Sequence, residues 1–168
     1  MRLFAVFICL GCIVCAWLQL HHYLALLPSK IAVRFDIHGQ PGGWTDKKGF
    51  TLQYLFLLGV IMGVFGIFAA IVHKLPARFI NIPHRDYWLA IPQRKGTLDY
   101  LRELYLWSAA FGGIFIVGVM EMIIRANLNP PAAITGRFIY TAFGTFAIFV
   151  VCGIALVYWR FKKPATNT

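Results

Sequence analysis

Acidic side chains are scarce in this chain of 168 residues, which contains six Asp and Glu residues against sixteen Lys and Arg residues. Charged residues of both signs make up only 13% of the sequence, whereas about a quarter is usual for soluble domains. Catalytic motifs are also missing, because the sequence has no HExxH zinc motif, no glycine-rich phosphate loop and no nucleophile placed beside a base. These absences argue against a soluble enzyme.

Hydrophobic residues, in contrast, make up 60% of the chain, and its mean hydropathy is +0.70. A small globule cannot bury so much apolar side chain, because small domains leave a large fraction of their surface in water. The composition therefore predicts an integral membrane protein. The net charge of +10 does not predict nucleic-acid binding, because Lys and Arg gather at the ends of apolar runs, where they contact lipid headgroups.

Four apolar runs are long enough to cross about 30 Å of hydrocarbon, which needs about 20 helical residues. We expect spans at about residues 3–27, 52–72, 104–124 and 138–159. The first run is too long for the apolar core of a signal peptide, and we expect it to stay uncleaved. The predicted fold class is an all-α integral membrane protein, in which residues 1–168 form one membrane domain of four transmembrane helices.

Lys and Arg are distributed unequally between the flanks of these spans. The N-terminus, the connection between the second and third spans, and the tail with Arg160, Lys162 and Lys163 carry ten of them, and the other flanks carry six. The positive-inside rule therefore predicts cytoplasmic N- and C-termini. The loop of residues 27–50 then faces outward, as a short extracytoplasmic segment between the first two helices.

This outer loop combines a short extended segment with a turn. Alternating apolar residues from Ile31 to Phe35 predict a β-like segment, and the glycine-rich residues 39–43 predict a turn. Asp46, with Thr45, is placed to cap the second helix. The loop residues that we expect to contact a partner or ligand are Arg34, Phe35, Asp36, His38, Trp44, Asp46 and Lys47.

The order Leu-Pro, Ile-x-Val-x-Phe and Gly-x-Pro-x-Gly-Trp-x-x-Lys in this loop resembles domain of unknown function 1648. That domain occurs in small bacterial and archaeal membrane proteins, and in the front half of proteins like the immunity protein against the sporulation-delaying toxin of bacilli. Residues 80–90 are similar to the Asn-Leu-Pro-Asn-Lys-x-Tyr-Trp-Leu motif of its short members, and residues 124–128 also resemble them. The chain departs from the pattern at Arg34, where members often have His, and at Gly42, where they often have Asp.

The resemblance implies a prokaryotic inner or plasma membrane protein, and the missing catalytic motifs predict that it is not an enzyme. Its role would be recognition or immunity, sensing, or that of an accessory subunit. The expected partners are membrane lipid and another membrane protein or a peptide. A GxxxG pair, Gly59 and Gly63, permits close helix contact, so an oligomer is also compatible with the sequence.

Two sets of metal ligands can be considered in the first half of the chain. Asp36 and His38, together with His21 or His22, could begin a metal site, although rings at a helix end usually lie at the headgroup boundary. Thiolates could hold Cu(I) or form redox pairs, although free cysteines mostly pack as small apolar side chains. Three cysteines lie in the first span: Cys9, Cys12 and Cys15. We expect no cofactor and no bound metal.

Glu121 is the one acid inside a predicted span. A carboxylate in hydrocarbon is costly and marks a functional site by default. Arg125 lies four residues further on, on the same helix face, and can pair with it. With Asn127 these residues form a polar group near the outer end of the third span. They support an alternative function, a small transporter or a membrane assembly factor that uses the Glu121–Arg125 pair.

The connection between the second and third spans contains prolines that exclude one regular helix. We expect it to lie along the cytoplasmic interface, with Tyr and Trp inserted among the headgroups. Thr97 is placed to cap the third helix. The interfacial candidates are Asn81, Pro83, His84, Asp86, Tyr87 and Trp88.

Overall fold

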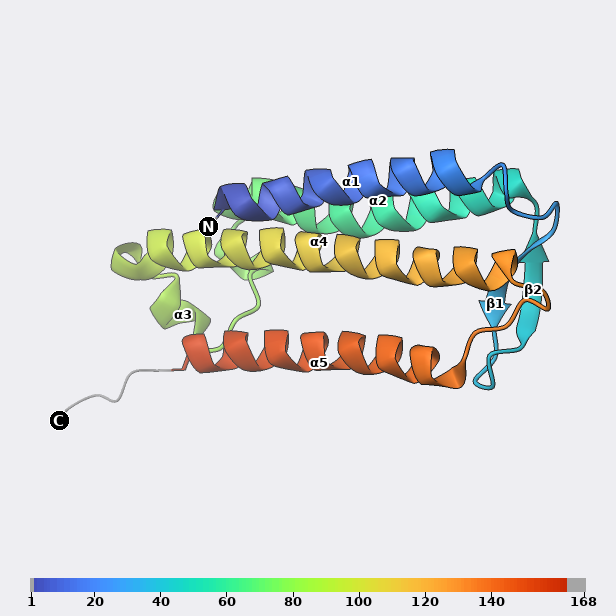
Figure 1. The fold of residues 1–168 in the computed structure, drawn as a ribbon. Coiled ribbons are helices and arrows are strands. Elements are labelled where there is room, and N and C mark those ends of the chain that lie inside the picture. Colours follow the sequence, from blue (N-terminus) through green and yellow to red (C-terminus); the bar gives the residue numbers. More distant parts are fainter. Residues whose placement is uncertain (1, 163–168) are drawn as a thin grey trace.

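The computed structural model describes residues 2–162 and consists mainly of four long helices (Figure 1). They are α1 (Arg2–Tyr23), α2 (Lys47–Ile71), α4 (Ile91–Leu128) and α5 (Gly136–Arg160). A hairpin of two strands, β1 (Ile31–Phe35) and β2 (Pro41–Thr45), connects α1 to α2. The connection from α2 to α4 contains η1 (Val72–Lys74), η2 (Ala77–Phe79) and α3 (Arg85–Trp88). Lys163, counted above in the basic tail, lies outside the described residues.

All four long helices are long and apolar enough to cross a membrane, which confirms the number of such helices that the sequence predicts. The third is longer than expected. α4 contains 38 residues and is about 57 Å long, whereas the hydrocarbon core of a bilayer is about 30 Å thick. The predicted span of residues 104–124 is therefore only the apolar part of α4, and the polar first turns extend beyond it.

The start of α4 corrects the prediction that Thr97 caps the third helix. The helix begins at Ile91, after Ala90 as its N-cap, and Pro92 lies in its first turn. Proline is tolerated there because the first turn of a helix has no intrahelical partner for its N–H groups. Thr97 lies inside the helix and is buried, and its hydroxyl donates to the carbonyl of Trp88 at 2.9 Å.

The end of α1 is also earlier than predicted, at Tyr23 rather than at Leu27. The N–H groups of Leu26 and Leu27 both donate to the carbonyl of Tyr23, which closes the chain into a turn directly after the helix. Pro28 follows this turn, and the residue before a proline is disfavoured in the helical region. Leu27 is buried in the core instead of continuing the span.

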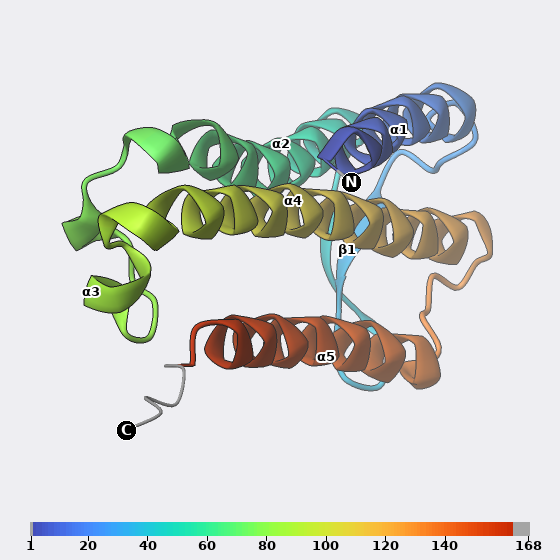
Figure 2. The ribbon, with the colours of Figure 1, turned by 90° about the vertical axis from the view of Figure 1, so that its left-hand side faces the viewer.

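The long helices are arranged so that α1 and α2 both pack on α4, while α5 lies apart on the other side of α4 (Figures 1 and 2). None of the residues of α5 is buried. α1 begins and α5 ends at the same end of the molecule as α3, which we call the connection end. The hairpin lies at the opposite end, which we call the hairpin end.

Each end of the molecule has its own cluster of buried apolar side chains. The first cluster lies near the hairpin end and combines residues of α1, β1, α2 and α4, with Ile31, Phe50, Tyr54 and Ile124 almost fully buried. The second lies at the connection end, where Val72, Ile82 and Leu101 pack with Phe161. Because Phe161 follows α5 directly and is fully buried, it attaches the end of α5 to the start of α4.

The hairpin confirms the predicted extended segment at residues 31–35, but its turn is not where the glycines predict it. β1 and β2 are antiparallel, and residues 41–43 belong to β2 rather than to the turn. One carboxylate oxygen of Asp36 accepts from the N–H groups of His38 and Gln40 at 2.9 and 2.8 Å, which closes the turn. Gly39 has a φ of +80°, a conformation that glycine adopts without strain.

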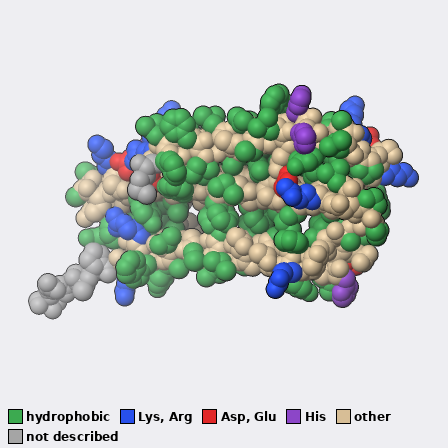
Figure 3. All heavy atoms as spheres, viewed as in Figure 1, with side chains coloured by type: hydrophobic (Ala, Val, Ile, Leu, Met, Phe, Trp, Pro, Cys, Tyr) green, Lys and Arg blue, Asp and Glu red, His purple; other side chains and the backbone are tan. Residues whose placement is uncertain are grey.

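The molecular surface is apolar along the helices and basic at the two ends. Hydrophobic side chains cover most of the face seen in Figure 3, and Lys and Arg gather mainly toward the two ends. Such a band of apolar surface between basic ends is typical of a protein whose middle contacts hydrocarbon and whose ends contact headgroups.

Replacing Gly113 with leucine is expected to destabilise the contact between α1, α2 and α4. A Cβ atom at this position would lie 3.1 Å from the Cys12 sulfur and 3.3 Å from the Met62 sulfur, so the larger side chain must push aside the side chains of Cys12 on α1 and Met62 on α2. Overpacking of this kind costs about 1–3 kcal/mol, measurable as a lower free energy of unfolding in detergent. Gly118→Leu is the matched control on α4, because nothing lies within 4 Å of its Cβ position. Equal losses in the two variants would contradict the described packing.

Candidate functional site

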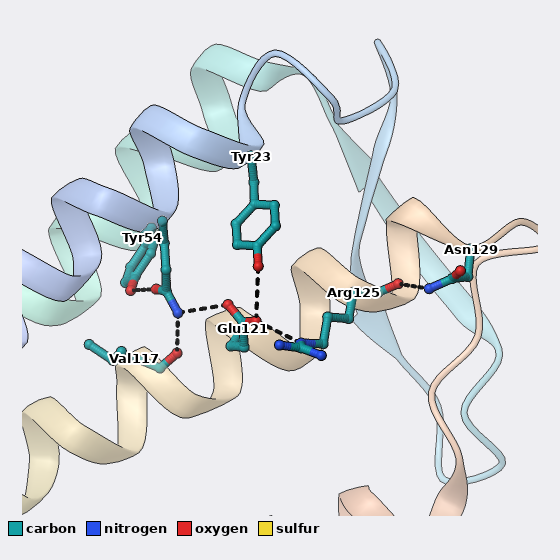
Figure 4. Close-up of polar contacts among 7 residues, drawn as sticks. Tyr23, Tyr54, Val117, Glu121, Arg125 and Asn129 are labelled. Atoms are coloured by element: carbon teal, nitrogen blue, oxygen red, sulfur yellow. Dashed lines mark hydrogen bonds and ion pairs between the residues drawn. The ribbon is translucent and has the colours of Figure 1, made fainter.

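A group of polar side chains around Glu121 joins the three packed helices near the hairpin end (Figure 4). The Nε atom of Arg125 donates to Glu121 Oε1 at 2.6 Å, so the two residues form the ion pair that their spacing predicts. The amide of Gln19, on α1, donates to Glu121 Oε2 at 2.9 Å. The hydroxyl of Tyr23 lies 3.4 Å from Glu121 Oε1. The carboxylate of α4 is therefore bonded to α1 at two positions.

Gln19 extends the same group to α2. Its amide nitrogen lies 3.5 Å from the carbonyl of Val117, and its amide oxygen accepts from the hydroxyl of Tyr54. Tyr54 is fully buried. Gln19 thus contacts α4 and α2 at once, and we refer to Gln19, Tyr23, Tyr54, Glu121 and Arg125 as the Glu121 network.

The sequence indicates only part of this network. Glu121 and Arg125 stand out as charges in an apolar run, but Gln19 and Tyr54 were not among the expected site residues. A single amide in the middle of the first span was a usable signal, because a polar side chain in hydrocarbon is costly without a partner. Tyr54 gives no such signal, since tyrosine is common in apolar segments near an interface.

Asn127 attaches the hairpin to the end of α4. Its side-chain oxygen accepts from the N–H of Ala32 at 2.7 Å, and its side-chain nitrogen donates to the carbonyl of Ala32 at 2.9 Å. The same nitrogen also donates to the carbonyl of Ile123. Asn127 and Ala32 are both buried. The side chain therefore satisfies both backbone groups on the outer edge of β1, as a neighbouring strand would.

The tip of the hairpin has a second contact with the rest of the molecule. The N–H of Ile134, in the segment between α4 and α5, donates to the carbonyl of Gly39 at 3.0 Å. A side chain at Gly39 would collide with the carbonyl of Ile134. The hairpin is thus held by α4 at β1 and by the segment between α4 and α5 at its turn.

Several loop residues that we expected to meet a partner instead support the local structure. Asp46 is the N-cap of α2, as predicted, and accepts from the N–H of Gly49 at 2.8 Å. The ammonium of Lys47 donates to the carbonyl of Leu24 at 2.7 Å and so caps the end of α1. Phe35 packs against the first core cluster, and Asp36 closes the hairpin turn.

The remaining loop candidates lie on the outside of the hairpin. Arg34, His38 and Trp44 are exposed, Trp44 to 54%. Ile37, which the sequence did not single out, is 64% exposed beside them in the turn. Trp44 also lines an open cavity of about 600 Å³ with Lys30, at the base of the hairpin.

The potential metal ligands do not come together. Among residues 2–162, no three His, Cys, Asp or Glu side chains lie close enough to hold an ion. In α1, Cys12 is buried and packs near Gly113, whereas Cys15 is exposed on the helix surface.

The candidates in the connection divide between the surface and the second core. Asn81, His84, Asp86 and Tyr87 are exposed, and Pro83 is half-buried. Trp88 is also half-buried, and its indole N–H donates to the carbonyl of Phe161 at 2.8 Å. Trp88 therefore packs against the end of α5, a contact that the sequence did not predict.

A charge cluster at the connection end was not expected either. Arg2, at the start of α1, donates to the carboxylate of Asp99 at 2.7 Å, and His73 lies 3.4 Å from the same oxygen. The Arg2–Asp99 ion pair joins residues that are 97 positions apart in the sequence, so no local sequence pattern predicts it.

The four long apolar helices indicate the class of multi-pass membrane proteins. The chain has no matching family model, and no curated protein or solved structure matches it either. The resemblance to domain of unknown function 1648 therefore stays a prediction from the sequence.

Replacing Asn127 with alanine is expected to loosen the hairpin. The change leaves the N–H and C=O groups of Ala32 without partners, at a cost of about 1–3 kcal/mol. Amide hydrogen exchange of residues 31–45, measured by mass spectrometry, should then become about tenfold faster or more.

Asn129→Ala is the matched control, because Asn129 is exposed and its side chain donates only to the nearby carbonyl of Arg125. It should leave the exchange of the hairpin unchanged. Hairpin exchange that is equally fast in both variants, or unchanged in both, would contradict the role assigned to Asn127.

Proposed function

We propose that this chain is a non-enzymatic protein of a prokaryotic inner or plasma membrane that recognises another membrane protein or a peptide through its hairpin. Its role is immunity, sensing or that of an accessory subunit, as the resemblance to domain of unknown function 1648 implies. The termini and the connection lie in the cytoplasm in this proposal, because Lys and Arg are more numerous there. The hairpin then lies outside, where a partner meets it.

The observation that carries the proposal is that the hairpin is both fixed in place and exposed. Asn127 and Ile134 hold its backbone, while the side chains of Ile37, Trp44 and Arg34 remain exposed. Tryptophan and arginine are enriched among the residues that contribute most to protein–protein affinity. A surface that is already ordered also loses less conformational entropy on binding.

The Glu121 network favours recognition over transport. Both carboxylate oxygens of Glu121 are bonded within the protein, to Gln19, Tyr23 and Arg125. A carboxylate that carried a proton or an ion through the membrane would have to break these contacts in every cycle. In our proposal Glu121 instead positions α1 on α4, and so supports the end of the bundle on which the hairpin lies.

A photo-cross-linking side chain at position 37, introduced in cells that produce the full chain, should give one discrete adduct with a protein or peptide. The same side chain at position 148 is the control, because Ile148 is 66% exposed on α5, away from the hairpin. Trp44→Ala should reduce the adduct at position 37 by about 30-fold or more, since a tryptophan anchor buried in an interface is typically worth about 2 kcal/mol or more. Glu121→Gln, which keeps the size of the side chain and one acceptor oxygen but removes the charge, should leave the adduct in place.

Three outcomes would overturn the proposal: no adduct at position 37, the same adducts at positions 37 and 148, or an adduct that survives Trp44→Ala but is lost with Glu121→Gln. The last outcome would favour the alternative, a transporter or assembly factor that depends on the charge of Glu121.

A further inference from the structure

A groove runs between α4 and α5 near the connection end, and the recognition proposal does not use it. Its volume is about 860 Å³, within the range of about 300–1,000 Å³ that is common for small-molecule sites. The lining is mostly apolar and aromatic, with Tyr105 and Trp107 on α4 and Phe149 and Ile154 on α5. The groove is open on its outer side, so a molecule in the surrounding hydrocarbon can enter it laterally.

The groove exists because α5 is attached to α4 at separate points rather than along its length. Phe161 holds the end of α5 in the second core cluster. Further along, the rings of Phe111 and Phe149 stack with their centroids 3.7 Å apart. The groove lies beside these contacts, and its lining comes from both helices. Apolar side chains that face an unfilled space lose their dispersion contacts, which favours an apolar occupant.

A cation, Arg160, lies on α5 directly beyond the residues that line the groove. Leu156 and Val157 line the groove, and Arg160 follows them by four and three residues, on the same face of the helix. Its guanidinium lies over the rings of Trp88 and Tyr100, 5.0 and 5.5 Å from their centroids.

Stacking occupies the faces of the Arg160 guanidinium and leaves its in-plane N–H groups available, and these match a phosphate in geometry. Among residues 2–162, no hydrogen bond or ion pair formed by the Arg160 side chain is found. The connection end around Arg160 is also positively charged, since basic residues outnumber acidic ones there. The basic residues are Arg2, Lys74, Arg78, Arg85, Arg94, Lys95, Arg102, Arg160 and Lys162, and the acidic ones are Asp86, Asp99 and Glu103.

We propose that the groove binds an anionic phospholipid, with an acyl chain along the apolar lining and the headgroup phosphate on Arg160. The positive charge selects a lipid with a net negative headgroup over a zwitterionic one. A transmembrane helix of a second copy or of another protein would bring no phosphate to Arg160. This proposal rests on the arrangement of α4 and α5 and is independent of recognition through the hairpin.

The test is native mass spectrometry of the full chain in a mild detergent, titrated with dioleoyl phosphatidylglycerol or with dioleoyl phosphatidylcholine. One phosphatidylglycerol should bind more tightly than phosphatidylcholine. Arg160→Gln should weaken its binding about tenfold, because it removes a charge-assisted hydrogen bond. Arg102→Gln removes the same charge from an exposed position at the same end and should leave the affinity unchanged.

A second pair of variants tests the groove itself. Gly153 lines the groove and has nothing within 4 Å of its Cβ position, so Gly153→Phe fits the fold and fills the space. It should abolish the tight binding of phosphatidylglycerol. Gly144→Phe, on the same helix, also meets nothing within 4 Å, but Gly144 is outside the groove lining, and binding should persist.

Equal affinities for the two lipids would overturn the proposal, as would equal losses in the two arginine variants or unchanged binding in Gly153→Phe. A dimer of the chain that dissociates in Gly153→Phe, without tight lipid binding, would assign the groove to a second copy instead.

Discussion

Hydrocarbon supplies no hydrogen-bond partners, and this constraint governs how the polar residues of the helices are used. Gln19 is bonded to both Glu121 and Tyr54, so that the cost of placing these three residues in an apolar bundle is offset inside the protein. The same contacts determine where α1 and α2 pack on α4. Among residues 2–162, the side-chain oxygen of Gln93 is the one buried polar side-chain atom without a partner, and it lies in the first turn of α4.

α4 is the element on which the rest of the molecule is assembled. Glu121 accepts hydrogen bonds from α1. Asn127 lies almost two turns further along α4 and is hydrogen-bonded to β1 of the hairpin. At the opposite end Asp99 pairs with the first residue of α1 that the structure describes. The hairpin and the groove beside α5 are therefore separate surfaces on one support, so the two proposed binding sites do not overlap.

Local patterns in the sequence predict much of this fold. Long apolar runs identify the four helices, alternation identifies β1, and the spacing of Glu121 and Arg125 predicts their ion pair. The start of α4 was missed because Pro92 resembles a helix breaker, although it is compatible with a first turn. The turn was predicted too late in the chain because glycine is typical of turns, whereas Gly42 and Gly43 belong to β2. The turn is closed instead by the side chain of Asp36. The contacts of Asn127 with Ala32 and of Asp99 with Arg2 join residues 95 and 97 positions apart, which no local pattern can predict.

The central claim is a bundle of four membrane-spanning helices with the hairpin outside and the connection in the cytoplasm. Labelling with a membrane-impermeant amine reagent tests it most directly, because exposed lysines lie at both ends. The account predicts that Lys30 and Lys48 are labelled in intact cells, and that Lys74 and Lys95 are labelled only after permeabilisation. The reverse pattern, or release of the protein from membranes by alkaline carbonate, would contradict it.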